Sequence, residues 1–131
     1  MIGLDTNVLL RFFAQDDPHQ NPLADATMAS LTPDDPGWVG LATVLEFVWA
    51  MSKKMRLAKP VVCNALERLL LLESVVLEQD IIVASAVQQF RLSRADFADC
   101  LIAASAQAAG CSKTVTFDQI AARDVGMELI T

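Results

Sequence analysis

Hydrophobic and polar positions along this chain follow two alternating patterns. Short apolar or β-branched runs are typical of buried strands, and the longer stretches between them have the spacing of helices. The short runs predict strands at Ile2–Leu4, Trp38–Leu41, Val75–Leu77, Thr114–Thr116 and Glu128–Ile130. The longer stretches predict helices at Thr6–Phe13, at Asp17–Leu31, from Val44 into the basic run Lys53–Lys59, and at Pro60–Leu72, Ile81–Phe90, Ser93–Ala109 and Phe117–Asp124. This alternation predicts an α/β fold with a short, mainly parallel sheet and helices on both faces.

Local signals mark where several of these helices begin and end. Asp17 followed by Pro18 is typical of an N-cap and a first helical residue, and Asp80 is expected to cap a later helix. Gly110 is expected just past a helix end, where a left-handed backbone is favoured. No low-complexity segment, internal repeat or linker divides the chain, so residues 1–131 are expected to form a single domain.

Composition argues against several classes of protein. No apolar run reaches the ~18 to 20 residues that a membrane span needs, because Asp99 interrupts the stretch 97–111. The N-terminal sequence has no basic segment ahead of an apolar one, which argues against a secretory signal. The three cysteines suggest neither a disulfide framework nor a zinc site. We therefore expect a cytoplasmic protein that has buried thiols and no membrane association.

Two bulk properties bear on the partners of this chain. The apolar fraction of 53% and the mean hydropathy of +0.39 are high for a soluble domain, which predicts an apolar surface covered by a partner or a second copy. The net charge of −6 repels nucleic acid. Binding of a polyanion therefore requires a bound cation or a confined basic patch.

Several acids stand at or beside the expected carboxyl ends of the strands, where ligands gather in parallel α/β sheets. Asp5 follows the first strand, and Asp118 lies just past the fourth. Glu46 is expected in the first turn of the helix after the second strand, and Asp99 in the second turn of the helix before the fourth. Carboxylates from separate elements suit Mg²⁺, which takes oxygen ligands and retains several waters.

Asp99 is the most informative of these acids. From Phe97 to Cys111 it is the only charge in an otherwise apolar and small-residue helix. A buried, unpaired carboxylate costs several kcal/mol, and Asp96 on the same helical face repels it. A bound cation relieves both penalties. Asp5, at the end of an apolar strand, is also poorly explained by capping, although an aspartate can begin a turn into a helix.

The other acids have structural interpretations as well. Residues 43–46 have the form of a capping box, in which Glu46 bonds back to the helix start, and residues 93–96 allow the same for Asp96. Asp118 can be a first-turn acid that the helix dipole favours. For these residues a structural and a functional role both stay open.

Together these residues resemble the PIN-domain ribonucleases, in particular the VapC toxins of bacterial and archaeal toxin–antitoxin pairs. The resemblance rests on Asp5-Thr6-Asn7 after an apolar strand, Glu46 early in a helix, the stretch Ala95–Ala104, and Thr116-Phe117-Asp118. It extends over nearly the whole chain. Its individual motifs are short, so its specificity lies in their order and spacing.

The resemblance implies a three-layer α/β/α sandwich and a metal-dependent endoribonuclease that hydrolyses RNA. The acids that would hold Mg²⁺ or Mn²⁺ are Asp5, Glu46, Asp99 and Asp118. Residues that would shape the site are Thr6, Asn7 and Thr116, and Asp96 matches an acid present in a subset of such domains. The family also implies a homodimer and a VapB-like antitoxin that covers the active site.

Two basic features are candidates for contacts with RNA. Arg11 shares a helical face with Asn7 and could bind a phosphate, and an ion pair with a neighbouring acid is the alternative. The run containing Lys53, Lys54, Arg56 and Lys59 could guide an RNA backbone or form a solvated face.

Two other functions remain open at this stage. A non-catalytic module could use the same fold and its apolar surface only to pair with another protein. An aspartate-based phosphatase is disfavoured, because Asp5-Thr6-Asn7 lacks a second acid two residues on.

Overall fold

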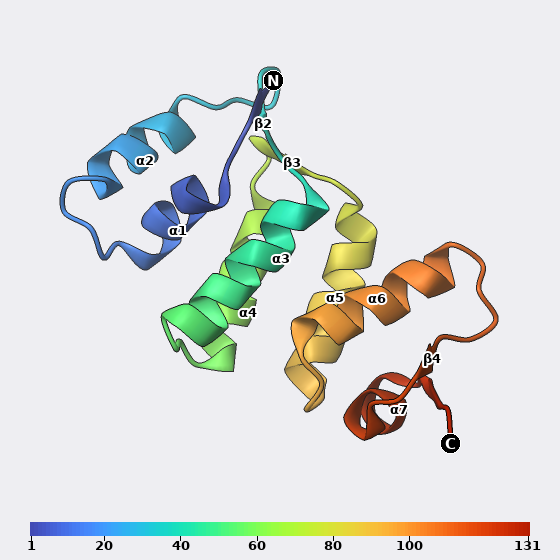
Figure 1. The fold of residues 1–131 in the computed structure, drawn as a ribbon. Coiled ribbons are helices and arrows are strands. Elements are labelled where there is room, and N and C mark those ends of the chain that lie inside the picture. Colours follow the sequence, from blue (N-terminus) through green and yellow to red (C-terminus); the bar gives the residue numbers. More distant parts are fainter. The chain divides into compact units, whose positions relative to one another are not determined.

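The chain forms two compact units, Met1–Glu78 and Gln79–Thr131, in a computed structural model that describes residues 1–131 (Figure 1). Both units combine short strands with longer helices, and every strand pair is parallel. The predicted α/β fold with short parallel strands is confirmed. The strands form two sheets, one in each unit, with the orders β1-β2-β3 and β4-β5. That the chain is a single domain stays a prediction.

The first unit is built around the sheet of three strands. Its elements are β1 (Ile2–Gly3), α1 (Thr6–Ala14), α2 (Asn21–Ala29), β2 (Gly37–Val39), α3 (Leu41–Trp49), the π-helical turn η1 (Ala50–Lys54), α4 (Lys59–Leu71) and β3 (Val75–Leu77). Ile2 pairs with Gly37, and Gly37 pairs with Val75. Because all three strands run in one direction, their carboxyl ends share one edge. Helices α1 and α3 both begin at that edge.

Large apolar side chains hold the first unit together. Phe47 of α3 is completely buried, and its ring centroid lies 5.6 Å from that of Phe13 in α1. The guanidinium of Arg68 lies 5.2 Å from the Phe13 ring centroid on α4's side of the cluster. In β2 a side chain at Gly37 would clash, because its Cβ would lie 2.7 Å from Leu4 Cδ1. This packing fixes where α1 and α3 begin relative to the sheet.

The second unit pairs two long helices and carries the small sheet. Its elements are α5 (Asp80–Leu92), α6 (Phe97–Ala108), β4 (Val115–Thr116), α7 (Gln119–Val125) and β5 (Glu128–Leu129). Phe90 of α5 and Phe97 of α6 pack edge to face, with ring centroids 5.7 Å apart. Val87, Cys100 and Leu101 are buried at the same helix pair. The start of α6 is therefore held against the end of α5.

Two helices of the first unit begin at other residues than the pattern predicted. Helix α2 begins at Asn21 and not at Asp17. The carboxylate of Asp17 caps a separate turn, where it accepts hydrogen bonds from the backbone N–H groups of His19 and Gln20 at 3.0 and 2.9 Å. Helix α3 begins at Leu41, which the pattern placed in the preceding strand. At Asp17 a local cap competes with hydrophobic spacing, whereas at the start of α3 the backbone N–H of Leu41 donates to Glu78, a residue distant in sequence.

The second unit corrects two further helix starts. Asp80 is the first residue of α5 and not its cap. Helix α6 begins at Phe97 and not at Ser93. The backbone N–H of Arg94 donates to Asp124 Oδ2 at 2.9 Å, and this long-range bond holds the segment outside the helix.

Other expectations at the level of the whole chain can be compared directly. Gly110 follows α6 with a φ of +91°, so the predicted helix end there is confirmed. The expectation of buried thiols is confirmed for Cys63 and Cys100 and is wrong for Cys111, which is exposed. None of the helices combines the length and the hydropathy that a membrane span needs.

Candidate active site

Asp5 lies directly beyond the sheet, at the N-terminus of α1. The preceding residue, Leu4, still donates its N–H to Trp38 O of β2 at 2.9 Å. Asp5 is the N-cap of α1, and its Oδ1 accepts the backbone N–H of Thr6 at 2.8 Å. Capping therefore does account for part of this side chain's position, contrary to the sequence-based expectation. Its second carboxylate oxygen makes no hydrogen bond within the chain.

The two residues after Asp5 differ in environment. The side chain of Thr6 is 4% exposed, and its Oγ1 has no hydrogen-bond partner. A buried hydroxyl without a partner is uncommon and calls for a physical reason. The next residue, Asn7, is exposed on the first turn of α1. Thr6 thus carries an unsatisfied hydroxyl at the position that directly follows Asp5 in the sequence.

Glu46 is exposed in the second turn of α3, not in the first as expected, and its side chain makes no hydrogen bond or ion pair. The capping-box interpretation of residues 43–46 is wrong, because α3 begins at Leu41 with Gly40 as its N-cap. Glu46 therefore lies six residues past the cap, roughly 9 Å along the helix at 1.5 Å per residue. Capping cannot account for it.

An acid that the sequence interpretation missed lies at the same edge of the sheet. Glu78 follows β3 and is half-buried, and its Oε1 accepts the backbone N–H of Leu41 at 2.8 Å. It therefore caps α3 from a neighbouring strand, where Gly40 has no side chain to do so. The available signal was an acid directly after an apolar strand, which is the same signal that Asp5 gives.

Three acids of the second unit lie near one another. Asp96 is the N-cap of α6, and its Oδ1 accepts the backbone N–H of Asp99 at 2.9 Å. Asp99 therefore lies in the first turn of α6, one turn earlier than expected, and is half-buried. Desolvation raises its pKa, and the negative charges of Asp96 and Asp118 raise it further. The repulsion expected between Asp96 and Asp99 is present.

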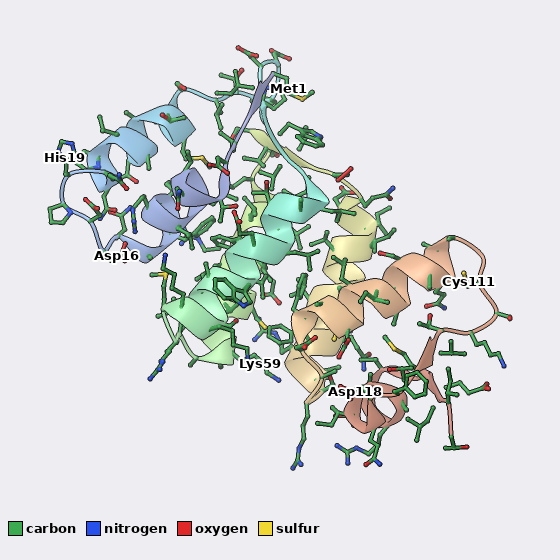
Figure 2. All side chains as sticks on the ribbon, in the orientation of Figure 1. Met1, Asp16, His19, Lys59, Cys111 and Asp118 are labelled. Atoms are coloured by element: carbon green, nitrogen blue, oxygen red, sulfur yellow. The ribbon has the colours of Figure 1, made fainter.

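Asp118 stands at the start of α7 (Figure 2). It is the N-cap of that helix, and its Oδ1 accepts the backbone N–H groups of Ile120 and Ala121 at 2.8 and 2.9 Å. Thr116 Oγ1 accepts the backbone N–H of Asp118 at 3.0 Å. Thr116 thus shapes the turn that carries Asp118. The Asp118 Oδ2 atom takes no part in the cap.

The acids are therefore distributed over both units. Asp5 and Glu46 belong to the first unit, and the second unit brings Asp99 near Asp118 and Asp96. No group of three or more histidine, cysteine or acidic side chains is arranged to hold a metal ion. Convergence of the four predicted acids stays a prediction.

The side chain of Arg11 is bound by polar residues that follow α1 in the sequence. Its Nη1 lies 3.0 Å from Asp16 Oδ1, and its Nε donates to Gln20 Oε1 at 2.7 Å. Arg11 therefore forms the ion pair that was its alternative interpretation, and a contact with a phosphate stays a prediction. By contrast Lys53, Lys54 and Arg56 are exposed.

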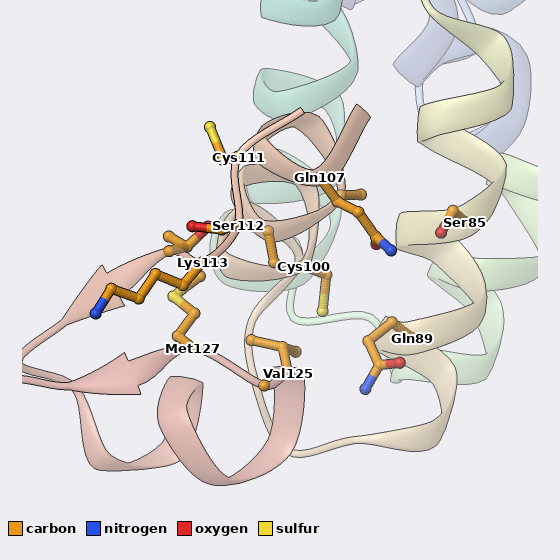
Figure 3. A pocket seen from close by; sticks show the side chains of 13 residues that line it. Ser85, Gln89, Cys100, Gln107, Cys111, Ser112, Lys113, Val125 and Met127 are labelled. Atoms are coloured by element: carbon orange, nitrogen blue, oxygen red, sulfur yellow. The ribbon is translucent and has the colours of Figure 1, made fainter. Parts of the chain in front are cut away.

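A pocket of about 370 Å³ also lies in the second unit, between α5, α6 and the small sheet (Figure 3). Gln89 and Gln107 line it from the two helices, and Lys113 is the only charged residue among its lining side chains. None of the predicted acids lines this pocket, so its chemistry is separate from theirs.

Comparison with known proteins gives one family and weak structural likenesses. A model of the PIN domain matches residues 2–125. VapC20 of Mycobacterium tuberculosis, described as a Sarcin-Ricin loop cleaving toxin, is 17% identical, with 94% of each chain covered and a TM-score of 0.45. FitAcB from Neisseria gonorrhoeae is 21% identical, covering 100% of this chain and 97% of the other, with a TM-score of 0.39. Both TM-scores are low, and neither likeness identifies an activity or a partner for this chain. No curated protein matches significantly in sequence.

Proposed function

This chain belongs to the PIN-domain family, and on that premise we propose that it is a metal-dependent endoribonuclease that hydrolyses RNA phosphodiester bonds. The observation that carries the proposal is the extent of the family match, because residues 2–125 include every predicted acid. In this proposal the ligands of Mg²⁺ or Mn²⁺ are Asp5, Glu46, Asp99 and Asp118. Thr6, Asn7 and Thr116 support them, and Asp96 has a supporting role through Asp99.

The donor set fits a hard divalent cation. Carboxylates and hydroxyls are the ligands that Mg²⁺ and Mn²⁺ take. Asp99 carries a raised pKa beside two like charges, which is the electrostatic condition that a cation relieves. The orphaned hydroxyl of Thr6 beside Asp5 offers a hydrogen bond to a bound water. These two observations come from different units and support the same kind of ligand.

A divalent ion in such a site supplies a nucleophilic water at neutral pH and stabilises charge on the phosphodiester. The residues of the chain provide orientation and proton transfer. Asp118 is held by two backbone N–H groups on Oδ1, which leaves Oδ2 free to bind. In this proposal Asp99 or Asp118 also orients the attacking water through its carboxylate and accepts its proton.

We also propose that the chain is the toxin of a VapBC-type toxin–antitoxin pair, acts in the cytoplasm as a homodimer, and is covered by its antitoxin. The exposed apolar side chains of α3 support a covered surface. Leu45 and Trp49, one helical turn apart, are 36% and 59% exposed. Large apolar groups left in water at this spacing are typical of a surface that a partner covers.

The test is cleavage of a labelled RNA by the purified chain in Mn²⁺, with and without EDTA. Cleavage is expected only without chelator, and Asp99→Asn is expected to abolish it. The matched control is Asp80→Asn, which removes the same charge from an exposed first-turn position of the same unit. Equal cleavage by both variants removes this mechanism. Absence of cleavage by the unaltered chain favours a non-catalytic interaction module.

A further inference from the structure

A hollow of about 630 Å³ in the second unit is lined by arginines. The residues around it are Arg91, Leu92, Ser93, Arg94, Arg123 and Asp124. This gives three guanidinium groups and one carboxylate, in a chain whose net charge is −6. The hollow is therefore a local positive region of the kind that an acidic protein needs in order to bind a polyanion.

Asp124 organises this hollow. Its carboxylate accepts the backbone N–H of Arg94 on Oδ2 and the Nε–H of Arg123 on Oδ1, both at 2.9 Å. Its backbone carbonyl accepts the side-chain amide of Gln89 at 2.6 Å. The two bonds to its carboxylate lower the pKa of Asp124, and all three bonds tie the end of α5, the start of the loop to α6, and α7 together. The carboxylate is thus occupied by bonds within the chain.

The guanidinium of Arg123 is held at one end and open at the other. Asp124 engages only Nε, and the Arg123 side chain is 63% exposed while that of Asp124 is 16% exposed. The two terminal nitrogens carry four further N–H donors in a planar fork that matches phosphate oxygens. Arg94 also lines the hollow and is exposed. Arg123 therefore presents directed N–H donors to an anion, and Arg94 adds a second exposed positive charge at the same hollow.

Arg94 and Arg123 are close in sequence to two of the candidate acids of the same unit. Arg94 lies two residues before Asp96, and Arg123 lies five residues after Asp118. We propose that Arg94 and Arg123 bind a backbone phosphate of single-stranded RNA, next to the phosphodiester that the acids act on. This inference rests on the proposed function. It places the contact with the RNA backbone at a locally positive hollow, because the net charge of the chain as a whole repels RNA.

The test is binding of a fluorescently labelled single-stranded RNA of mixed sequence to the full chain in EDTA, measured by anisotropy over a range of salt concentrations. Arg94→Gln and Arg123→Gln are each expected to weaken binding several-fold. Each is also expected to lower the slope of log affinity against log salt by about 0.7, the value for one lost phosphate contact on a single strand. Arg123→Lys retains the charge but not the fork, so it is expected to bind more weakly with an unchanged slope.

The matched control is Lys113→Gln, which removes one positive charge from the same unit at an ion pair with Glu128. Circular dichroism checks that every variant is folded. The inference is overturned if the arginine variants bind like Lys113→Gln, or if the chain does not bind this RNA. Arginine-dependent binding without any cleavage in Mn²⁺ contradicts the proposed nuclease and leaves the phosphate site standing, so the two failures are distinguishable.

Discussion

Replacement of Asp118 by asparagine and by alanine separates its two roles. Its Oδ1 accepts two backbone N–H groups at the start of α7, which is a complete N-cap. Asparagine caps a helix about as well as aspartate, whereas alanine costs about 1 kcal/mol at such a position. For a chain of this size that loss corresponds to a fall of about 3–5 °C in the unfolding midpoint. Asp118→Asn is expected to leave the midpoint nearly unchanged.

Activity is expected to respond differently from stability. If Asp118 holds a divalent ion, Asp118→Asn removes a charged ligand and lowers cleavage at least as much as the roughly 10–100-fold cost of losing an outer-shell partner. Thermal unfolding and cleavage of labelled RNA in Mn²⁺ measure the two effects on the same preparations. An asparagine variant that cleaves RNA at the rate of the unaltered chain would show that Asp118 is a cap alone.

Three further expectations concern stability. The pKa of Asp99 is raised by desolvation and like-charged neighbours, so its ionised form destabilises the folded state. Asp99→Asn should therefore unfold at a higher temperature than the unaltered chain in EDTA at neutral pH. This gain should vanish below the ordinary carboxyl pKa of 3.8, where the aspartate of the unaltered chain is as uncharged as the asparagine of the variant. Phe47→Ala should lower the free energy of unfolding, measured in urea, by about 3–5 kcal/mol, because Phe47 is completely buried. The control Phe117→Ala, at a position 79% exposed, should change it by less than about 0.5 kcal/mol. Gly126 ends α7 with a φ of +75°, so Gly126→Ala should lower the free energy of unfolding by about 1 kcal/mol in the same urea titration. Gly3→Ala, with open space around its Cβ position, serves as the control. Equal effects at the two glycines would refute the backbone argument.

The strands and the general positions of the acids were predictable from sequence because they depend on nearby residues. An apolar run followed by an acid identified Asp5 at the end of β1, and the spacing of apolar residues identified the long helices. The exact helix starts were not predictable in the same way. Asp17 caps a turn of its own, and the loop before α6 is held by Asp124, which lies 30 residues from Arg94.

The candidate site was predictable as a set of residues but not as a set of contacts. Glu78 caps α3 at Leu41 across 37 positions of sequence, and no local pattern relates the two residues. The capping roles of Asp96 and Asp118 depend on where their helices begin. The sequence pattern placed those starts a few residues too early. Asp96 was therefore interpreted as a first-turn acid that bonds back to the cap, whereas it is the N-cap itself.

By itself, the sequence determined the α/β class, the order of the elements and the candidate acids, because hydrophobic spacing and turn chemistry act over a few residues. Only the tertiary structure decided which charges are neighbours. It placed Asp99 near the charge of Asp118 and brought the backbone N–H of Arg94 to the carboxylate of Asp124, through contacts between residues far apart in the chain. Such contacts are set by how buried side chains such as Phe90 and Phe97 pack, and that packing is a property of the folded chain as a whole.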